Sequence, residues 1–300
     1  MVYFLALSTE GEARNYIGDK GKSPSTSKNT GFRGDCTESR AETDLNINNV
    51  RARLRAGGDM WWDGQQARYI VPNVDPASGE PEISSLFAGG IWVGAYDEGG
   101  NLILAAQTFR DNGNDYWPGP LDNLTGTISK TECASWDQHF TVYGQDIDDL
   151  RADFLDPLSP GVDNTPSRGL LGWPAKGNVH FLAIHGFDIL GYDQDLAPFI
   201  DINNDGRYDP WDGDHPVVEV IGCDRTDYDN PVYADQMTWW VYNDNGNLHT
   251  QTGGNAMNME VQALAFGYST TDAVNNMTFY RYKLLNRNAL RLENTYFSLW

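Results

Sequence analysis

The chain has 300 residues, of which 40% are hydrophobic and 12% aromatic, so it can bury a substantial core and is not a disordered chain. Its 42 acidic and 21 basic residues give a formal net charge of -21, which repels phosphate backbones and anionic lipid headgroups. This charge argues against nucleic-acid and membrane-surface partners and favours an extracellular or cell-surface location, where salt and divalent cations are plentiful. No apolar run approaches the roughly 18 residues of a membrane span.

Residues 1–44 are predicted to form an extended N-terminal arm, because residues 8–44 are short irregular runs of Gly, Ser, Thr and Lys. Residues 1–7 are too short for a complete signal peptide, and we expect the chain to be a fragment of a longer protein. Cys36, Cys133 and Cys223 lie far apart and outside any C-x-x-C pair, which argues against a zinc or redox motif. They form either one disulfide with an odd thiol or three free thiols, and the sequence does not decide which.

Short strands bounded by Gly, Pro and Asp clusters are predicted along most of the chain. The candidate segments are 45–54, 67–71, 90–96, 102–109, 138–143, 236–242, 259–268, 277–286 and 295–300. Two turn-rich segments, Asp97–Asn101 and Asn243–Asn247, are predicted as hairpin turns, and their similar surroundings leave a duplicated β module open. One short helix is expected over Asp146–Leu155, with Ile147, Leu150 and Phe154 on one face.

These elements predict a mainly β fold of β-sandwich-like modules with long loops. We divide the chain into the arm at 1–44, a β-rich module at 45–200, a calcium loop at 201–216 and a second β-rich module at 217–300. The second module is expected to be truncated at its C-terminal end, because residues 295–300 are a strand-like run without a turn after them.

The calcium loop is the most specific motif in the sequence. A twelve-residue EF-hand-like loop needs side-chain oxygens at positions 1, 3 and 5, Gly at position 6, a backbone carbonyl at position 7 and further ligands at positions 9 and 12. Gly206 occupies position 6 here. The predicted Ca²⁺ ligands are Asp201, Asn203, Asp205, the backbone carbonyl of Arg207, Asp209 and Asp212.

The loop departs from the EF-hand pattern at Asp212, where the usual Glu would bind calcium with both oxygens. The Pro at position 216 leaves no room for a second helix, so we expect a structural, dockerin-like loop and not a calcium sensor. The alternative is a solvated acidic loop held by Asx turns without a metal ion.

Catalytic motifs are missing from the sequence: it contains no H-E-x-x-H, no G-x-S-x-G and no phosphate-binding Gly loop. His180 and His185 are five residues apart, which does not place them on one face of a strand, so we expect ordinary hydrogen-bonded histidines. The tryptophans at 61, 62, 117, 239 and 240 could stack on sugars, but core packing is the better interpretation.

From position 46 onwards the chain resembles large secreted Bacteroidota proteins that carry a C-terminal type IX secretion sorting domain. The blocks that carry the resemblance are Asn48–Ala52, Gly58–Asp63, Ser85–Gly94, Ala105–Arg110, Asp115–Leu121, Gly172–Ala175, Leu196–Phe199 with its calcium loop, and Tyr282–Arg287. The resemblance implies export across the outer membrane and display on, or release from, the cell surface. It implies no activity, and the sorting domain itself is not in this sequence.

The function expected from the sequence is a calcium-stabilised structural or binding module of a secreted cell-surface protein, such as an adhesin or an appendage component, without catalytic turnover. Its expected partners are other domains of the same longer chain, further copies of itself or surface glycans. The alternative is a secreted hydrolase of polysaccharide or protein whose catalytic part lies partly outside these residues.

Overall fold

The computed structural model describes the backbone of residues 2–5 and the residues 34–110, 113–189, 191–192, 194–218, 232–287 and 291–300. Over these residues the fold is mainly β and β-sandwich-like, which confirms the predicted class. The predicted arm lies mostly outside the described residues, and so does Cys223.

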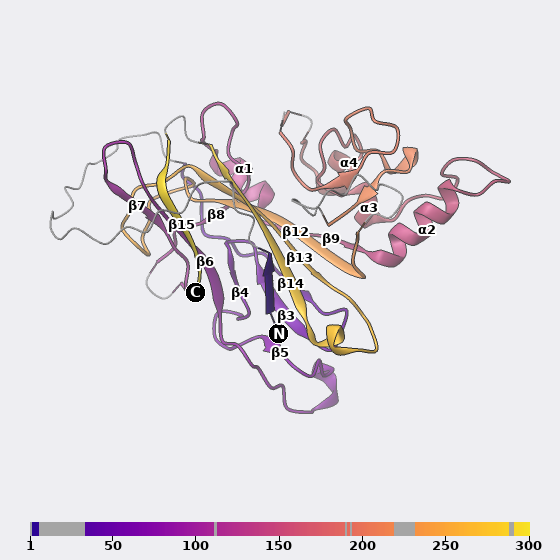
Figure 1. Cartoon of the computed structure of the whole chain (residues 1–300), viewed down its shortest axis with the longest axis horizontal. Coiled ribbons are helices and arrows are strands. Elements are labelled where there is room, and N and C mark those ends of the chain that lie inside the picture. Colours follow the sequence, from indigo (N-terminus) through magenta and orange to yellow (C-terminus); the bar gives the residue numbers. More distant parts are fainter. Residues whose placement is uncertain are drawn as a thin grey trace.

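Two large sheets form the sandwich (Figure 1). The first contains, in order, β1 (Val2–Leu5), β14 (Thr278–Asn286), β13 (Met259–Gly267), β12 (Gln236–Asn243) and β8 (Trp117–Pro118), with β9 (Phe140–Tyr143) also paired to β12. The second contains β15 (Glu293–Leu299), β6 (Gly89–Tyr96), β4 (Asp59–Met60), β3 (Arg51–Arg55) and β2 (Glu42–Leu45), with β5 (Tyr69–Ile70) paired to β3 and β7 (Leu102–Ala105) paired to β6. All strands are antiparallel to their neighbours except β1, which is parallel to β14.

A third layer covers the outer face of the first sheet. It contains the helices α1 (Lys130–Trp136), α2 (Gly144–Phe154), α3 (Arg168–Leu171) and α4 (Phe181–His185) and the small sheet of β10 (Phe199–Ile200) and β11 (His215–Pro216). Short 3₁₀ turns lie at Pro76–Ser78, Pro210–Asp212 and Ala273–Asn276. In Figure 1, α2, α3 and α4 lie to the right of the long strands β12 to β14, and β4, β6 and β7 lie to their left.

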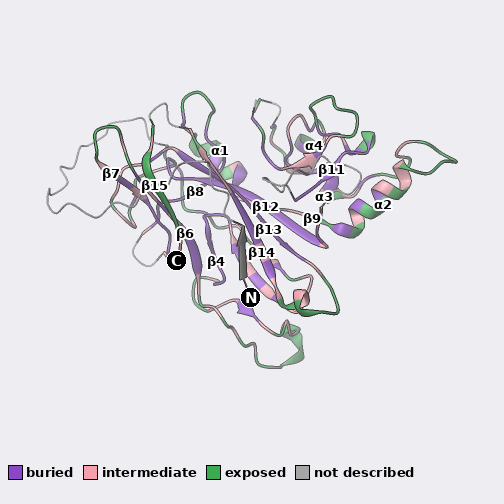
Figure 2. Cartoon of the chain, viewed as in Figure 1, coloured by how far each residue is buried: buried purple, intermediate pink, exposed green. Residues whose placement is uncertain are grey.

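The two faces of β12 explain this three-layer arrangement. Successive side chains of a strand point to opposite faces. Trp240 packs in the core between the two sheets, and its neighbour Trp239 packs in a second core against the helical layer. All residues of β12 and β13 are buried (Figure 2), so both faces of these strands are covered. The buried set includes polar side chains as well as apolar ones: Gln236, Thr238, Asn243, Glu260 and Gln262. In contrast, β3 alternates, with Ala52 and Leu54 buried and its arginines facing outward.

The prediction of a single short helix is wrong in number. The predicted helix is present as α2, with Ile147 and Leu150 buried, but the described residues contain three more helices. The N-terminus of α1 is closed by a capping box in which Ser129 and Glu132 each bind the backbone of the other. The helices α3 and α4 have only four and five residues, too few for a helical period to show in the sequence.

The two predicted hairpin turns differ. Asp97–Asn101 closes the hairpin of β6 and β7, with the Asp97 N–H donating to the Asn101 carbonyl oxygen at 3.0 Å. Asn243–Asn247 closes no hairpin, because β13 begins only at Met259. Its Asn243 and Asn245 side chains are buried and donate to the backbone carbonyls of Trp117, Gly119 and Gly126. The segment is therefore bound to β8 and to the chain that follows it, instead of making an exposed turn.

Both predicted β-rich ranges, 45–200 and 217–300, supply strands to each large sheet: β8 and β9 pair with β12, and β15 pairs with β6. The arm is joined to the helical layer by a disulfide between Cys36 and Cys133, whose Cα atoms are 5.8 Å apart. The Cys36 N–H also donates to the Gly246 carbonyl oxygen at 3.0 Å.

His139 provides a testable pH dependence of stability. Its ring lies 5.5 Å from that of Trp240, its Nε2 is buried without a hydrogen-bond partner, and burial lowers its pKa to about 3. The folded protein thus keeps a neutral ring, whereas the unfolded chain binds a proton below about pH 6.5. Stability is fully present above that pH and is lost as the pH falls toward 3.

We expect His139 to account for a loss of about 2 kcal/mol in the free energy of unfolding between pH 7 and pH 5. Denaturant unfolding of the wild type and of His139→Phe at both pH values measures this contribution. The variant should lose less stability than the wild type on acidification. Equal losses of stability in the two proteins would show that His139 is not the source of this pH dependence.

Candidate calcium loop

The predicted calcium loop connects the two strands of the small sheet. Its ends are held together by pairing of Phe199 with Pro216 and of Ile200 with His215. In the middle of the loop, the buried Tyr208 donates its hydroxyl to the Leu170 carbonyl oxygen at 2.9 Å. The loop is therefore a closed connection attached to the core of the helical layer, and its fold depends on that layer.

The first half of the loop turns sharply, as predicted. Asn204 and Gly206 have φ values of 60° and 79°, in the left-handed region that Gly and Asn tolerate best. The Asp201 carboxylate accepts from the Gly206 N–H at 2.8 Å and from the Asp205 N–H at 3.2 Å. The Asp205 carboxylate accepts from the Arg207 N–H at 2.8 Å. These bonds wrap the backbone around the oxygens at positions 1 and 5.

Of the remaining predicted side-chain ligands, Asn203 and Asp212 join this group and Asp209 does not. Asn203 accepts from the Asp205 N–H at 3.0 Å and donates to Asp212 at 3.1 Å. Asp209 instead accepts from the Trp211 N–H at 3.0 Å and lies 3.1 Å from His180 Nε2. The side chain of Arg207 packs on the backbone of Gly177.

Asp214 is the residue of this loop that the sequence analysis missed. It is fully buried and accepts from the N–H groups of Ile202 at 2.8 Å and Asp209 at 3.0 Å, so it ties both ends of the loop together. Burial raises its pKa to about 6; the two backbone donors oppose this rise, and the charges of Asp201 and Asp205 add to it. Asp214 follows Asp212 by two residues and so continues the alternating acidic positions of the loop. This spacing is the signal by which the sequence could have identified it.

The donor set fits a hard cation, because carboxylate and amide oxygens are the ligands that Ca²⁺ prefers. In the geometry described, the acidic side chains accept backbone N–H groups. Among the described residues, no group of three or more His, Cys, Asp or Glu side chains is placed to hold a metal ion. Calcium binding at this loop stays a prediction from donor chemistry and spacing.

The two histidines singled out in the sequence do not share a site. His180 precedes α4 and contacts Asp209 of the loop. His185 ends α4 and packs on Phe181 with ring centroids 4.4 Å apart, its nitrogens 3.0 Å from Gln138 Oε1 and 2.9 Å from the Gly172 carbonyl oxygen. Burial lowers the pKa of His185. Both are ordinary hydrogen-bonded histidines.

The five tryptophans considered for sugar stacking are between 1% and 6% exposed. They lie in the cores of the fold, as predicted. A sugar needs an accessible ring face for stacking, so these residues offer no platform for a glycan.

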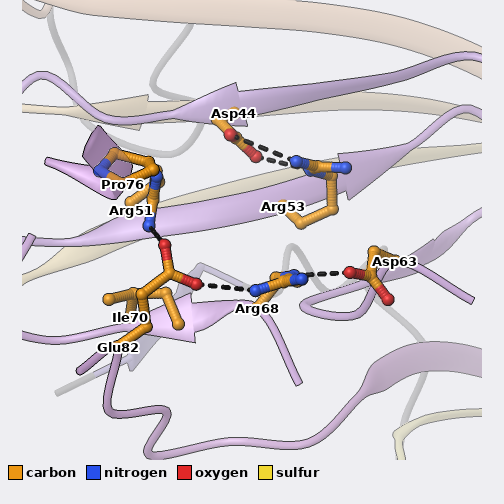
Figure 3. Close-up of a pocket in the computed structure, with 8 residues that line it drawn as sticks. All are labelled: Asp44, Arg51, Arg53, Asp63, Arg68, Ile70, Pro76 and Glu82. Carbon is orange, nitrogen blue, oxygen red and sulfur yellow. Dashed lines mark hydrogen bonds and ion pairs between the residues drawn. The ribbon is translucent and has the colours of Figure 1, made fainter. Parts of the chain in front are cut away.

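A separate pocket of about 290 Å³ opens on the outer face of the second sheet (Figure 3). It is lined by Asp44, Arg51, Arg53, Asp63, Arg68, Ile70, Pro76 and Glu82. Glu82 pairs with both Arg51 and Arg68, Arg68 also pairs with Asp63, and Arg53 pairs with Asp44. Each arginine in the pocket already has a carboxylate partner, so an anionic ligand would have to break existing ion pairs. The pocket is better explained as a stabilising charge network on the sheet.

A scan against protein-family models and searches of curated proteins and of solved structures returned no match. Within the described residues, no helix has the length and apolar character needed to cross a membrane.

Proposed function

We propose that this chain is a calcium-stabilised structural or binding module of a secreted cell-surface protein, serving adhesion or an extracellular appendage. The observation that carries the proposal is the loop 201–214, in which Asp201, Asn203, Asp205 and Asp212 surround one turn and Asp214 is buried beneath it. Five aspartates in one short loop repel one another unless a cation is present. A divalent cation would neutralise this charge and fix the turn.

Two further observations support an extracellular setting. The Cys36–Cys133 disulfide is of a kind that persists in oxidising compartments and is rare in the cytosol. The net charge of -21 is best tolerated where calcium and salt are abundant. Export by the type IX route rests on the resemblance of the sequence blocks to surface proteins that use it.

Calcium should raise the melting temperature. Extracellular modules bind calcium with dissociation constants of about 10⁻⁴ to 10⁻³ M, so about 10 mM calcium adds on the order of 1.4 to 2.7 kcal/mol by mass action. Thermal melts with calcium and with chelator measure this shift. Asp205→Ala should remove most of it, because the change deletes a ligand beside Gly206.

Asp272→Ala is the matched control, since Asp272 is an exposed turn aspartate outside the loop that accepts from the Val274 N–H at 2.9 Å. This variant should keep the full calcium shift. Coincident melts of the wild type with and without calcium would refute the proposed role of calcium.

Catalysis and binding are separated by a second experiment on the same protein. A hydrolysis screen over polysaccharides and peptides should show no turnover, and a glycan array reports whether the module binds sugars. Hydrolysis that disappears on mutating a single Asp, Glu or His would favour the hydrolase alternative.

A further inference from the structure

His249 lies in the long connection after β12, with its side chain 1% exposed. Its Nδ1 is 2.9 Å from the Leu104 carbonyl oxygen, and its Nε2 is 2.6 Å from the Asp244 carbonyl oxygen. A carbonyl oxygen can only accept hydrogen bonds, and a neutral imidazole carries one N–H and one lone pair. A neutral ring would therefore direct a lone pair at a carbonyl oxygen on one side.

The surrounding charges fit a ring with two protons. Asp115 Oδ2 lies 3.8 Å from Nδ1 and Asp244 Oδ2 lies 3.7 Å from Nε2, and both carboxylates are fully buried. A buried positive charge is tolerated when opposite charges lie this close. The two carboxylates approach from different segments, so the ring is flanked by negative charge on both sides.

Both carboxylates are themselves held as acceptors. Asp115 accepts from the Ala106 N–H at 3.1 Å, the Gln251 N–H at 2.9 Å and the Thr252 hydroxyl at 2.7 Å. Asp244 accepts from the N–H groups of Met257 at 2.6 Å and Met259 at 2.7 Å. Donors of this kind stabilise the ionised form of a carboxyl group. Burial raises the pKa of Asp244, and the nearby His249 opposes that rise.

We propose that His249 is a doubly protonated imidazolium in the folded protein and forms a proton-dependent clasp with Asp115 and Asp244. The clasp joins the end of β7, the segment before β8 and the connection between β12 and β13. The titratable Tyr116 interacts electrostatically with both aspartates, and its hydroxyl donates to the Ala105 carbonyl oxygen at 3.2 Å. The ring of Trp117 lies 5.9 Å from the imidazole.

The clasp makes stability depend on pH in the direction opposite to His139. Above about pH 6.5 an unfolded histidine is mostly neutral, so folding takes up a proton at His249. The stability that His249 contributes is present at lower pH and is lost as the pH rises. Loss of the proton would leave two buried carboxylates without their counter-charge and loosen the three segments.

The direct test is nitrogen NMR of the full chain with ¹⁵N-labelled histidines at pH 7.5. Both ring nitrogens of His249 should carry a hydrogen. His185 is the internal control: one of its nitrogens faces Gln138, whose amide can rotate to donate, so it should carry a single ring hydrogen. A His249 ring with only one protonated nitrogen would overturn the proposal.

Unfolding equilibria between pH 7 and 8.5 give a second readout. The folded-to-unfolded ratio of the wild type should fall with rising pH by up to tenfold per unit relative to His249→Gln. Parallel pH dependences in the two proteins would contradict the clasp. If the variant does not fold, the NMR result decides alone, with the His249 signals assigned through their contact with Trp117.

Discussion

Replacing Cys36 and Cys133 together by serine should lower the free energy of unfolding by about 4 kcal/mol. The bridge links residues that are 97 positions apart in the sequence. In the chain-entropy model, cross-linking a loop of about that length raises the free energy of the unfolded chain by about 4.7 kcal/mol. Native disulfides measured in small secreted domains contribute about 2 to 5 kcal/mol. This is a large share of the stability of a typical domain.

Denaturant unfolding of the wild type with and without reductant, next to the double variant, measures this effect. The reduced wild type and the variant should unfold at the same denaturant concentration, and the variant should not respond to reductant. A loss below about 1 kcal/mol would mean that the other contacts of Cys36 hold the arm without the bridge.

Asp59→Asn should cost about 3 to 5 kcal/mol, because it leaves buried arginine charge without its counter-ion. The Asp59 side chain is fully buried, whereas those of Arg110 and Arg55 are 8% and 12% exposed. Arg110 Nε lies 3.1 Å and Arg55 Nε 3.5 Å from the carboxylate, which also accepts from the indole of Trp62 at 2.8 Å. The amide keeps the shape of the side chain, removes the charge and replaces one acceptor oxygen by an N–H₂ donor that would face another donor.

Glu42→Gln is the matched control. Glu42 also pairs with an arginine, Arg53, but its side chain is 40% exposed, and exposed pairs contribute about 0.2 to 1 kcal/mol. The losses in the free energy of unfolding, measured by chemical denaturation of both variants, should therefore differ by at least 2 kcal/mol. Similar losses would show that burial of the Asp59 network does not decide its strength.

The long strands were predictable because local composition and turn residues mark them, whereas two-residue strands such as β4, β8, β10 and β11 were not predicted. β6, β12, β13 and β14 each lie within two residues of the predicted ranges. The helices α3 and α4 were missed because a segment of four or five residues completes hardly more than one turn. Burial of Leu170 of α3 and Phe181 of α4 in the core of the helical layer decides their conformation instead. The capping box of α1 was visible in the sequence as Ser129 and Glu132 and could have been used.

The candidate site was predictable in part. Alternating oxygens and Gly206 predicted a turn wrapped around Asp201 and Asp205, and the structure has that turn. The orientation of Asp209 toward His180 could not be predicted, because it depends on where α4 packs. For the same reason, nothing in the local pattern shows that His249 meets Asp115, since the two residues are far apart in sequence.

The most direct test of the proposed calcium loop is a calcium titration of metal-free protein by isothermal titration calorimetry. We expect one Ca²⁺ per chain with a dissociation constant of about 10⁻⁴ to 10⁻³ M. Binding should be lost in Asp201→Ala and kept in Asp272→Ala. A wild-type protein that binds no calcium in this range, or an Asp201→Ala variant that binds it as the wild type does, would contradict the account.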